Sequence, residues 1–102
     1  MYNNGMAVVS FGKIKSCVKK VAEVYGVRSV TLFGSYAEGK NTSKSDIDLL
    51  VDFGSEARSY FDVFGFQNEL EELIGKSVDV VIAPIPKDSF LEIGTEILLY
   101  AA

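Results

Sequence analysis

Three short β-type runs, separated by helix-type patterns, leave a chain of 102 residues with few available folds. The segments at 27–33 ("VRSVTLF"), 46–53 ("DIDLLVDF") and 77–83 ("SVDVVIA") are rich in β-branched and other apolar residues, as strands are. Residues 13–25 and 61–74 instead place apolar side chains at helical spacing. Such alternation favours helices packed on a sheet. We therefore predict an α/β fold, with a small mixed three-stranded sheet and flanking helices.

Each helix-type pattern carries an apolar stripe that we expect to face the core. A glycine follows each pattern, Gly26 and Gly75, where helices commonly end. A last helix is expected from about Lys87 to Tyr100, and the whole chain, 1–102, is expected to form one domain. The expected core positions are Ile14, Cys17, Val18, Val21, Val24 and Tyr25 in the first helix, and Val63, Phe66, Leu70, Leu73 and Ile74 in the second.

Composition excludes several kinds of site. The chain has no histidine, which excludes Cys/His zinc sites and histidine-based catalytic triads. Its one cysteine, Cys17, lies on an apolar stripe, so we expect a buried structural thiol and no internal disulfide. A formal net charge of −4 argues against a stand-alone nucleic-acid binder. The N-terminus shows neither a signal peptide nor a membrane span, which makes a cytoplasmic location the expectation.

Two carboxylates stand two residues apart in the second predicted strand. Side chains alternate along a strand, so Asp46 and Asp48 should point to one face, with Cα atoms roughly 6.5 Å apart. Two like charges on one sheet face repel each other, and divalent metal ions would remove that repulsion. Carboxylate oxygens suit Mg²⁺, which binds one or two carboxylates together with substrate phosphates. Asp46 and Asp48 are therefore candidate metal ligands.

Asp79 is the third candidate, because it interrupts an otherwise apolar strand. An unpaired carboxylate is costly to bury there. It therefore faces either solvent or the same site as Asp46 and Asp48. The pair could also form only a solvated face with Asp52. An EF-hand is a poor alternative, since Leu50 and the next residue stand where a ligand and a glycine are needed.

The loop after the first strand, "GSYAEGKN", nearly matches a phosphate-binding P-loop. That motif ends in Ser or Thr, whereas this chain has Asn41, and it normally sits in a larger parallel sheet. Gly34 and Ser35 directly follow a strand and are expected to open one helical turn within a polar loop, 34–44. Backbone N–H groups at such a place can hold an anion, and Ser35 adds a hydroxyl donor. Taken alone, the loop could equally be only a turn.

Together these pieces resemble a known family. Gly34-Ser35, ten further residues, Asp46-Ile47-Asp48 and the later Asp79 match the signature of the polymerase-beta-type nucleotidyltransferase superfamily. The chain resembles its minimal nucleotidyltransferase (MNT) members, including MntA-like antitoxins that pair with HEPN-domain toxins. The resemblance covers about 13–100 and rests on "SVTLFGSYAEGKNTSKSDIDLLVDF", "ELEELIGKSVDVV" and "EILLYA".

The resemblance implies a complete set of roles. Gly34, Ser35 and Lys44 would hold the triphosphate of ATP, and Asp46, Asp48 and Asp79 would bind Mg²⁺, with two ions expected. Asp79 would also help to activate the acceptor. A hydroxyl, expected to be a tyrosine of a HEPN toxin, would attack the α-phosphate and become AMPylated while pyrophosphate leaves. A homodimer or a hetero-oligomer with the toxin is compatible with this picture.

One residue departs from the family pattern. Many relatives read "GSxARG", whereas "GSYAEG" places Glu38 where they have arginine. Arginine is a strong bidentate donor to phosphate, and a glutamate would repel it unless it points away. Lys40 and Lys44 are available to compensate. A non-covalent antitoxin that neutralises the toxin by covering it is therefore the alternative function, and transfer to RNA or a small molecule is a weaker one.

The segment "YFDVFGF" raises a separate question about a partner. Phe61 and Phe64 lie off the core stripe of their helix, which Gly65 could loosen. Their rings either pack under the preceding linker or form part of a partner surface, since exposed aromatic patches mark such sites.

Overall fold

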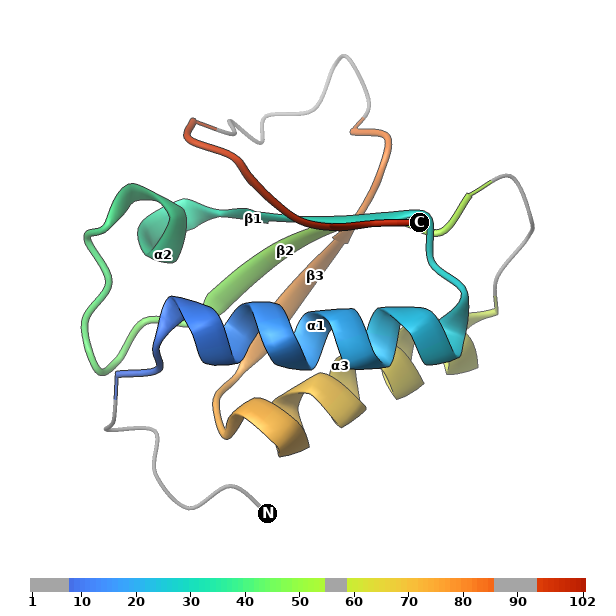
Figure 1. Cartoon of the computed structure of the whole chain (residues 1–102), viewed down its shortest axis with the longest axis horizontal. Helices are drawn as coiled ribbons and strands as arrows, with labels where there is room; N and C mark the ends of the chain where they lie inside the picture. The colour runs from blue at the N-terminus through green and yellow to red at the C-terminus, as the bar shows by residue number, and fades with distance from the viewer. Residues whose placement is uncertain (1–7, 55–58, 86–93) are drawn as a thin grey trace.

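The computed structural model describes residues 8–54, 59–85 and 94–102. It contains three helices and four strands in these ranges, coloured along the chain in Figure 1. In order they are α1 (Phe11–Tyr25), β1 (Ser29–Phe33), α2 (Gly34–Glu38), β2 (Ile47–Asp52), α3 (Tyr60–Ile74), β3 (Val78–Ile82) and β4 (Ile97–Ala101).

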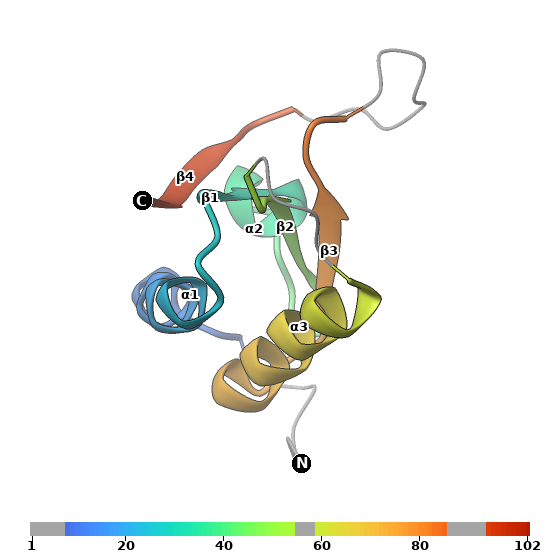
Figure 2. The same cartoon turned by 90° about the vertical axis from the view of Figure 1, so that its right-hand side faces the viewer.

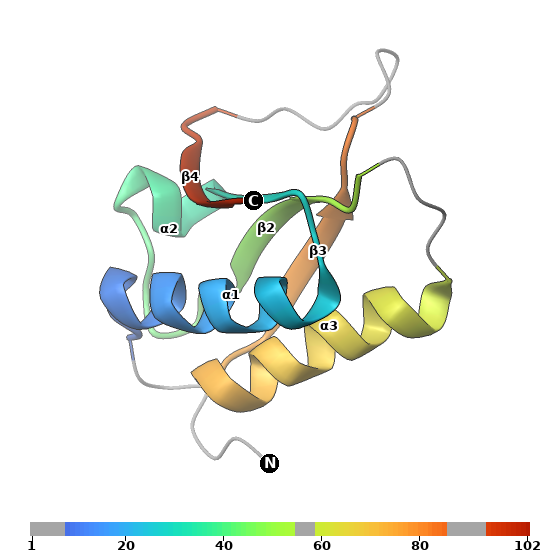
Figure 3. The ribbon, with the colours of Figure 1, turned by 45° about the vertical axis from the view of Figure 1, so that its right-hand side comes forward.

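The strands form one mixed sheet in the order β3-β2-β1-β4. β1 pairs antiparallel with both β2 and β4, whereas β2 and β3 are parallel and run side by side in Figure 3. Seen from the end in Figure 2, α1 and α3 lie together on one face of this sheet. Among the described residues no helix covers the opposite face, which keeps it accessible. The predicted α/β fold with flanking helices is confirmed.

The hydrophobic core lies between the sheet and the two long helices. Ile47, Leu49 and Val51 alternate along β2 and are fully buried on the helix side, as the sequence predicted. Phe66 of α3 is also fully buried, and its ring makes edge-to-face contacts with the rings of Tyr25 and Phe53, each at a centroid distance of 5.8 Å. The side chains of β2 that point away from the helices, including Asp48, remain partly exposed.

The sheet has a fourth strand where the sequence predicted the end of a helix. β4 pairs antiparallel with β1, so the predicted helix from Lys87 to Tyr100 is wrong over 97–100, and 86–93 lie outside the described residues. A short apolar run such as "EILLYA" has no period that separates a strand from a buried helix. This run forms a strand because it pairs with the free edge of β1, which is distant in the sequence.

The two long helices begin and end with local signals that the sequence contains. Ser10 accepts a hydrogen bond from the N–H of Lys13 at the start of α1, and Ser59 forms a capping box with Asp62 at the start of α3. Gly26 ends α1 and Gly75 ends α3, both in the left-handed conformation. α2 is the helical turn expected after Phe33.

Three expected core positions need correction. Val24 is 73% exposed and Leu73 is 44% exposed, although both were expected in the core. Each lies at the margin of its stripe, where the helix surface turns from the core towards solvent. Cys17 packs against the core but is only half-buried.

α3 is a regular helix from Tyr60 onwards, so Gly65 does not loosen it. Tyr25 crosses the helix at this glycine, and its hydroxyl donates a hydrogen bond to Glu69 at 3.2 Å. A Cβ atom on Gly65 would lie 2.5 Å from the Tyr25 hydroxyl oxygen, which explains the glycine. Phe61 and Phe64 are 88% and 56% exposed, so neither ring is packed away.

The described helices include none that is long and apolar enough to cross a membrane.

Tyr36 of α2 provides a test of the packing. Its hydroxyl is buried and has no hydrogen-bonding partner among the described residues. An unsatisfied buried hydroxyl is unfavourable, so Tyr36→Phe should raise the free energy of unfolding by about 1 kcal/mol in urea denaturation. The matched control is Tyr60→Phe, a 79% exposed tyrosine whose change should stay within about 0.5 kcal/mol. A less stable Tyr36→Phe variant would contradict this description.

Candidate active site

Two of the predicted carboxylates lie directly opposite each other on neighbouring strands. The parallel register of β2 and β3 places Asp48 beside Asp79, and the antiparallel register of β1 and β2 places Phe33 on the other side of Asp48. Asp46 lies one residue before β2 and is exposed, as is Asp79, whereas Asp48 is half-buried. We call Asp46, Asp48 and Asp79 the carboxylate cluster.

The carboxylate cluster interacts electrostatically. Burial raises the pKa of the Asp48 carboxyl above its ordinary value, and the negative charges of Asp79 and Asp46 raise it further. A side-chain hydrogen bond to Asp79 acts in the same direction, because it favours the protonated form of Asp48. The strand register therefore holds negative charges together against their mutual repulsion.

Gly34 brings the start of α2 into contact with Asp48. A Cβ atom on Gly34 would overlap Asp48 Oδ2 and would lie 3.1 Å from its Cγ atom. The φ angle of Gly34 is 74°, a left-handed conformation that glycine adopts most readily. Both constraints require glycine, and they place the turn from β1 into α2 against the carboxylate cluster.

The other predicted nucleotide-binding residues flank this contact. Ser35 is half-buried at the second position of α2, and no side chain caps the N-terminus of that helix. Lys44 is exposed in the loop before β2, where its N–H donates to Thr42 Oγ1 at 3.2 Å. The structure thus brings Gly34, Asp48 and Asp79 together and leaves the Lys44 side chain at the surface. The roles of all of them in binding stay predictions.

The carboxylate cluster fits a metal site that is completed by a substrate. Within the described ranges, no group of three or more His, Cys, Asp or Glu side chains is arranged so that it could hold a metal ion by itself. Asp48 nevertheless interacts with the charges of Asp46 and Asp79. Mg²⁺ commonly takes only one or two carboxylates and uses substrate phosphates for the rest. Side-chain oxygens beside a glycine turn are therefore the donor set that a metal–nucleotide pair requires.

Glu38, the departure from the family pattern, lies at the end of α2. Its Oε1 atom is 3.7 Å from Lys40 Nζ, and its Oε2 atom is 3.5 Å from the position that a Cβ atom on Gly94 would take. Gly94 precedes β4, on the opposite side of β1 from β2 and β3. Lys40 thus pairs with Glu38, although an exposed pair of this kind contributes little to stability.

Sequence reasoning missed Lys76, which lies in the turn between α3 and β3. Its side chain is only 3% exposed, and Nζ donates a hydrogen bond to the carbonyl oxygen of Ser43 at 2.6 Å. The signal available in the sequence was weak, because a lysine after a helix-ending glycine is typical of an exposed turn.

Comparison with known proteins agrees with this geometry. The family model described as "Nucleotidyltransferase domain" matches residues 14–98, which include Gly34 and the whole carboxylate cluster. The chain belongs to the nucleotidyltransferase domain family. The resemblance to minimal nucleotidyltransferases is thereby confirmed.

Two curated relatives are similar along most of this nucleotidyltransferase. "Putative protein adenylyltransferase MJ0435" of Methanocaldococcus jannaschii is 37% identical over 94 residues, covering 88% of this chain and 100% of the relative. "Protein adenylyltransferase MntA" of Thermococcus cleftensis is 37% identical over 81 residues, covering 76% of this chain and 81% of the relative. The family model describes a nucleotidyltransferase, and both relatives are named as enzymes of that class, protein adenylyltransferases.

A solved structure supports the fold independently. The crystal structure of a toxin–antitoxin with AMP-PNP contains a chain with a TM-score of 0.67 and 17% identity, covering 86% of this chain and 73% of that chain. At this identity the likeness shows the nucleotidyltransferase fold.

The raised pKa of Asp48 predicts a pH-dependent stability. The folded chain binds this proton more tightly than the unfolded chain, so the protonated carboxyl stabilises the fold at low pH. That stabilisation is lost as the pH rises from the ordinary value of 3.8 through the raised pKa of the folded chain. Asp48→Asn, which stays neutral, should therefore melt at a higher temperature than the parent at pH 7 in EDTA.

The gain in melting temperature should shrink as the pH falls towards 4. Thermal melts of both proteins from pH 4 to pH 8 measure it. An Asp48→Asn variant that is less stable than the parent at pH 7, or a gain that does not change with pH, would contradict the assigned cause.

Proposed function

We propose that this chain transfers AMP from ATP to a hydroxyl group of a partner protein, a toxin of a toxin–antitoxin pair. The observation that carries the proposal is the contact of Gly34 with Asp48 inside the carboxylate cluster. The names of the relatives, protein adenylyltransferases that include an MntA, support the reaction and the acceptor class. The toxin–antitoxin complex with AMP-PNP supports ATP as the donor and a toxin as the partner.

Each residue of the site has a definite part in this proposal. Asp46, Asp48 and Asp79 would hold two Mg²⁺ ions, which supply charge stabilisation for the attacking and leaving oxygens. Gly34 keeps side-chain atoms away, so phosphate oxygens can approach the backbone N–H groups that open α2, with Ser35 and Lys44 as further donors. The acceptor oxygen forms a bond to the α-phosphorus as the bond to pyrophosphate breaks. In this proposal Asp79, which is exposed, accepts the hydroxyl proton.

The acceptor must come from another molecule. The described part of the chain is one layer of helices on one sheet, and Asp46 and Asp79 are exposed at its surface. A tyrosine of a HEPN-domain toxin is the acceptor we propose, in a cytoplasmic complex of the two proteins. Its phenol is long enough to bring a hydroxyl from the toxin surface to an open site.

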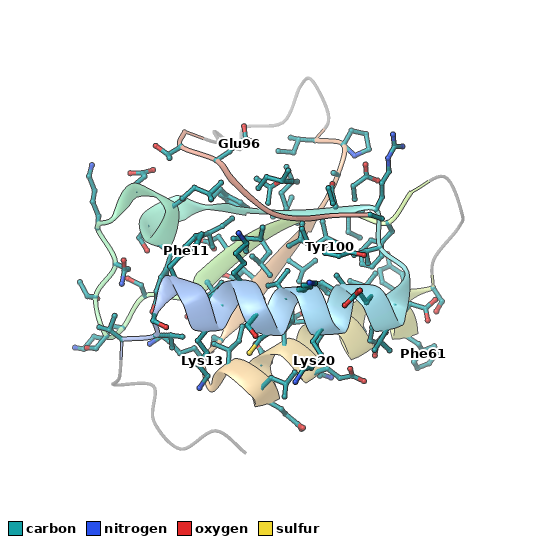
Figure 4. The ribbon with its side chains drawn as sticks, viewed as in Figure 1. Phe11, Lys13, Lys20, Phe61, Glu96 and Tyr100 are labelled. Atoms are coloured by element: carbon teal, nitrogen blue, oxygen red, sulfur yellow. The ribbon has the colours of Figure 1, made fainter. Side chains whose placement is uncertain are left out.

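α3 offers the surface for this partner. Tyr60, Phe61 and Phe64, which we call the aromatic patch, are all exposed, and Phe61 projects from the end of the molecule in Figure 4. The rings of Tyr60 and Phe64 lie 6.4 Å apart. Beside them is a pocket of about 320 Å³, lined by Ser59, Tyr60, Val63 and Ile82. α3 has four acidic residues and no basic one. A toxin surface with an apolar centre and basic residues around it would therefore complement α3.

The proposed reaction predicts a covalent product. Incubation of the chain with its partner toxin, ATP and Mg²⁺ should increase the intact mass of the toxin by one or more adenylyl groups. Asp46→Asn should lower the rate by about 100-fold or more while the circular dichroism spectrum stays unchanged, because the variant loses only a charged ligand. Glu23→Gln, which removes one exposed carboxylate from α1, outside the carboxylate cluster and the aromatic patch, is the control and should keep the parent rate.

An unchanged toxin mass within a stable complex would contradict transfer and would favour the alternative, neutralisation by non-covalent binding. Glu38 is the observation that favours this alternative, because it stands where relatives have a phosphate-binding arginine. Its pairing with Lys40 reduces, but does not remove, the negative charge near the loop. Full activity in Asp46→Asn would count against the carboxylate cluster itself.

The aromatic patch predicts a loss of affinity that is separate from catalysis. A double Phe61→Ser/Phe64→Ser variant should bind the toxin at least about tenfold more weakly in calorimetry, since exposed aromatic anchors dominate such interfaces. Val24→Ser removes a 73% exposed apolar side chain from α1 and is the matched control, which should bind normally. Unchanged affinity of the double variant would place the interface elsewhere.

A further inference from the structure

Lys76 is the only charged side chain among the described residues that is buried. A lysine loses strong hydration on burial, so a position like this is stable only when the ammonium group is well bound. Its hydrogen bond to the Ser43 carbonyl oxygen, at 2.6 Å, is of the short kind that charged donors form. Burial of a charge in a surface turn calls for an explanation beyond the fold.

The two residues of this bond occupy equivalent places before the carboxylates. Ser43 stands three residues before Asp46, and Lys76 stands three residues before Asp79. A second hydrogen bond joins the same two segments, from the N–H of Ile47 to the carbonyl oxygen of Ser77 at 3.0 Å. Lys76 therefore connects the two segments that lead into the carboxylate cluster.

One of the two segments is held firmly by α3. The N–H of Val78 donates to Glu71 Oε2 at 2.9 Å, and Gln67 Nε2 donates to the carbonyl oxygen of Val78 at 2.8 Å. Gly75 ends α3 immediately before Lys76. The turn that carries Lys76 is thus fixed to the core, and it can serve as an anchor.

The other segment has little packing of its own. None of residues 37–46 is buried. Residues 42–45 are linked to each other by hydrogen bonds, among them Thr42 N–H to Ser45 Oγ at 2.8 Å and Ser45 N–H to the Thr42 carbonyl at 3.1 Å. Such bonds shape the loop but do not attach it to the rest of the molecule. Within the described part of the chain, the hydrogen bonds of Ile47 and Lys76 connect this segment to the turn before β3.

We propose that Lys76 is a positioning residue: it holds the loop that carries Asp46 against the start of β3, so that Asp46 reaches the site formed by Asp48 and Asp79. Lys76 acts through the Ser43 carbonyl and is not itself a catalytic residue. The inference rests on the proposed function, because it concerns the same metal site. The strand register places Asp48 beside Asp79 but does not include Asp46. The hydrogen bond from Lys76 to the Ser43 carbonyl is the further contact that we assign to the placement of Asp46.

Binding of Mn²⁺ together with ATP, followed by electron paramagnetic resonance without a partner, tests the inference. Lys76→Met should raise the dissociation constant for Mn²⁺ about tenfold, which is the size of effect typical when a group that orients metal ligands is lost. Lys20→Met is the matched control: it also removes one positive charge, but from the exposed surface of α1 labelled in Figure 4. It should bind Mn²⁺ as the parent does.

Hydrogen exchange separates positioning from a general loss of stability. The backbone N–H groups of Thr42, Lys44, Ser45 and Ile47 are hydrogen-bonded in the structure. In Lys76→Met their exchange should accelerate while that of β1 stays at the parent rate. Acceleration in all strands alike would show a merely structural role and would overturn the proposal.

The outcomes distinguish failure of the proposed metal site from failure of the positioning role of Lys76. A parent that binds Mn²⁺ no better than Asp48→Asn would overturn the proposed metal site and this inference with it. A parent that binds, with a Lys76→Met variant that binds equally well, would overturn the positioning role alone. If Lys76→Met shows no cooperative melting, a Thr42→Ala/Ser45→Ala variant removes side-chain hydrogen bonds that shape the same loop without changing the core. Mn²⁺ affinity unchanged in that variant would contradict the role of loop position.

Discussion

The parallel pairing of β2 with β3 is the constraint on which the site depends. It sets Asp48 opposite Asp79, and the pKa of Asp48 is raised first by burial and then by the negative charge of Asp79. Buried residues on the helix side of β2 stabilise this register, because a slip of one residue would turn Ile47, Leu49 and Val51 out of the core. The apolar face of the sheet therefore stabilises the strained arrangement on its other face. Gly34 then adds the turn between β1 and α2 to the same place.

Most of the fold and the centre of the site could be predicted from the sequence, because local patterns determine them. The period of the helix patterns, the glycines that end α1 and α3, and the alternation in β2 all act within a few residues. The missed features arise between distant segments. β4 is a strand because β1 has a free edge, and the buried Lys76 donates a hydrogen bond to Ser43, 33 residues away in the sequence. Val24 and Leu73 were misplaced because periodicity gives the direction of a stripe but not its width.

The site combines a rigid part with a part that needs support. Asp48, Asp79 and Gly34 belong to the sheet or to its immediate end, and their mutual placement follows from strand pairing. Asp46 lies at the end of a loop with no buried side chain, and Lys76 links that loop to the anchored turn after α3. Glu38, at the far end of α2, is paired with Lys40 and directed towards the residues before β4. The departure from the family motif is thus at the last residue of α2, whereas Gly34, Ser35, Asp46, Asp48 and Asp79 match the motif.

The central claim is that the carboxylate cluster and Gly34 form one site for ATP and metal ions. Calorimetric titration of ATP into the chain, with Mg²⁺ and then with EDTA, tests it without any partner. The account predicts that ATP binds only with Mg²⁺ and that Asp48→Asn, a variant expected to be at least as stable as the parent, loses this binding. Equal binding of ATP by the parent in Mg²⁺ and in EDTA, or full Mg²⁺-dependent binding by Asp48→Asn, would contradict it.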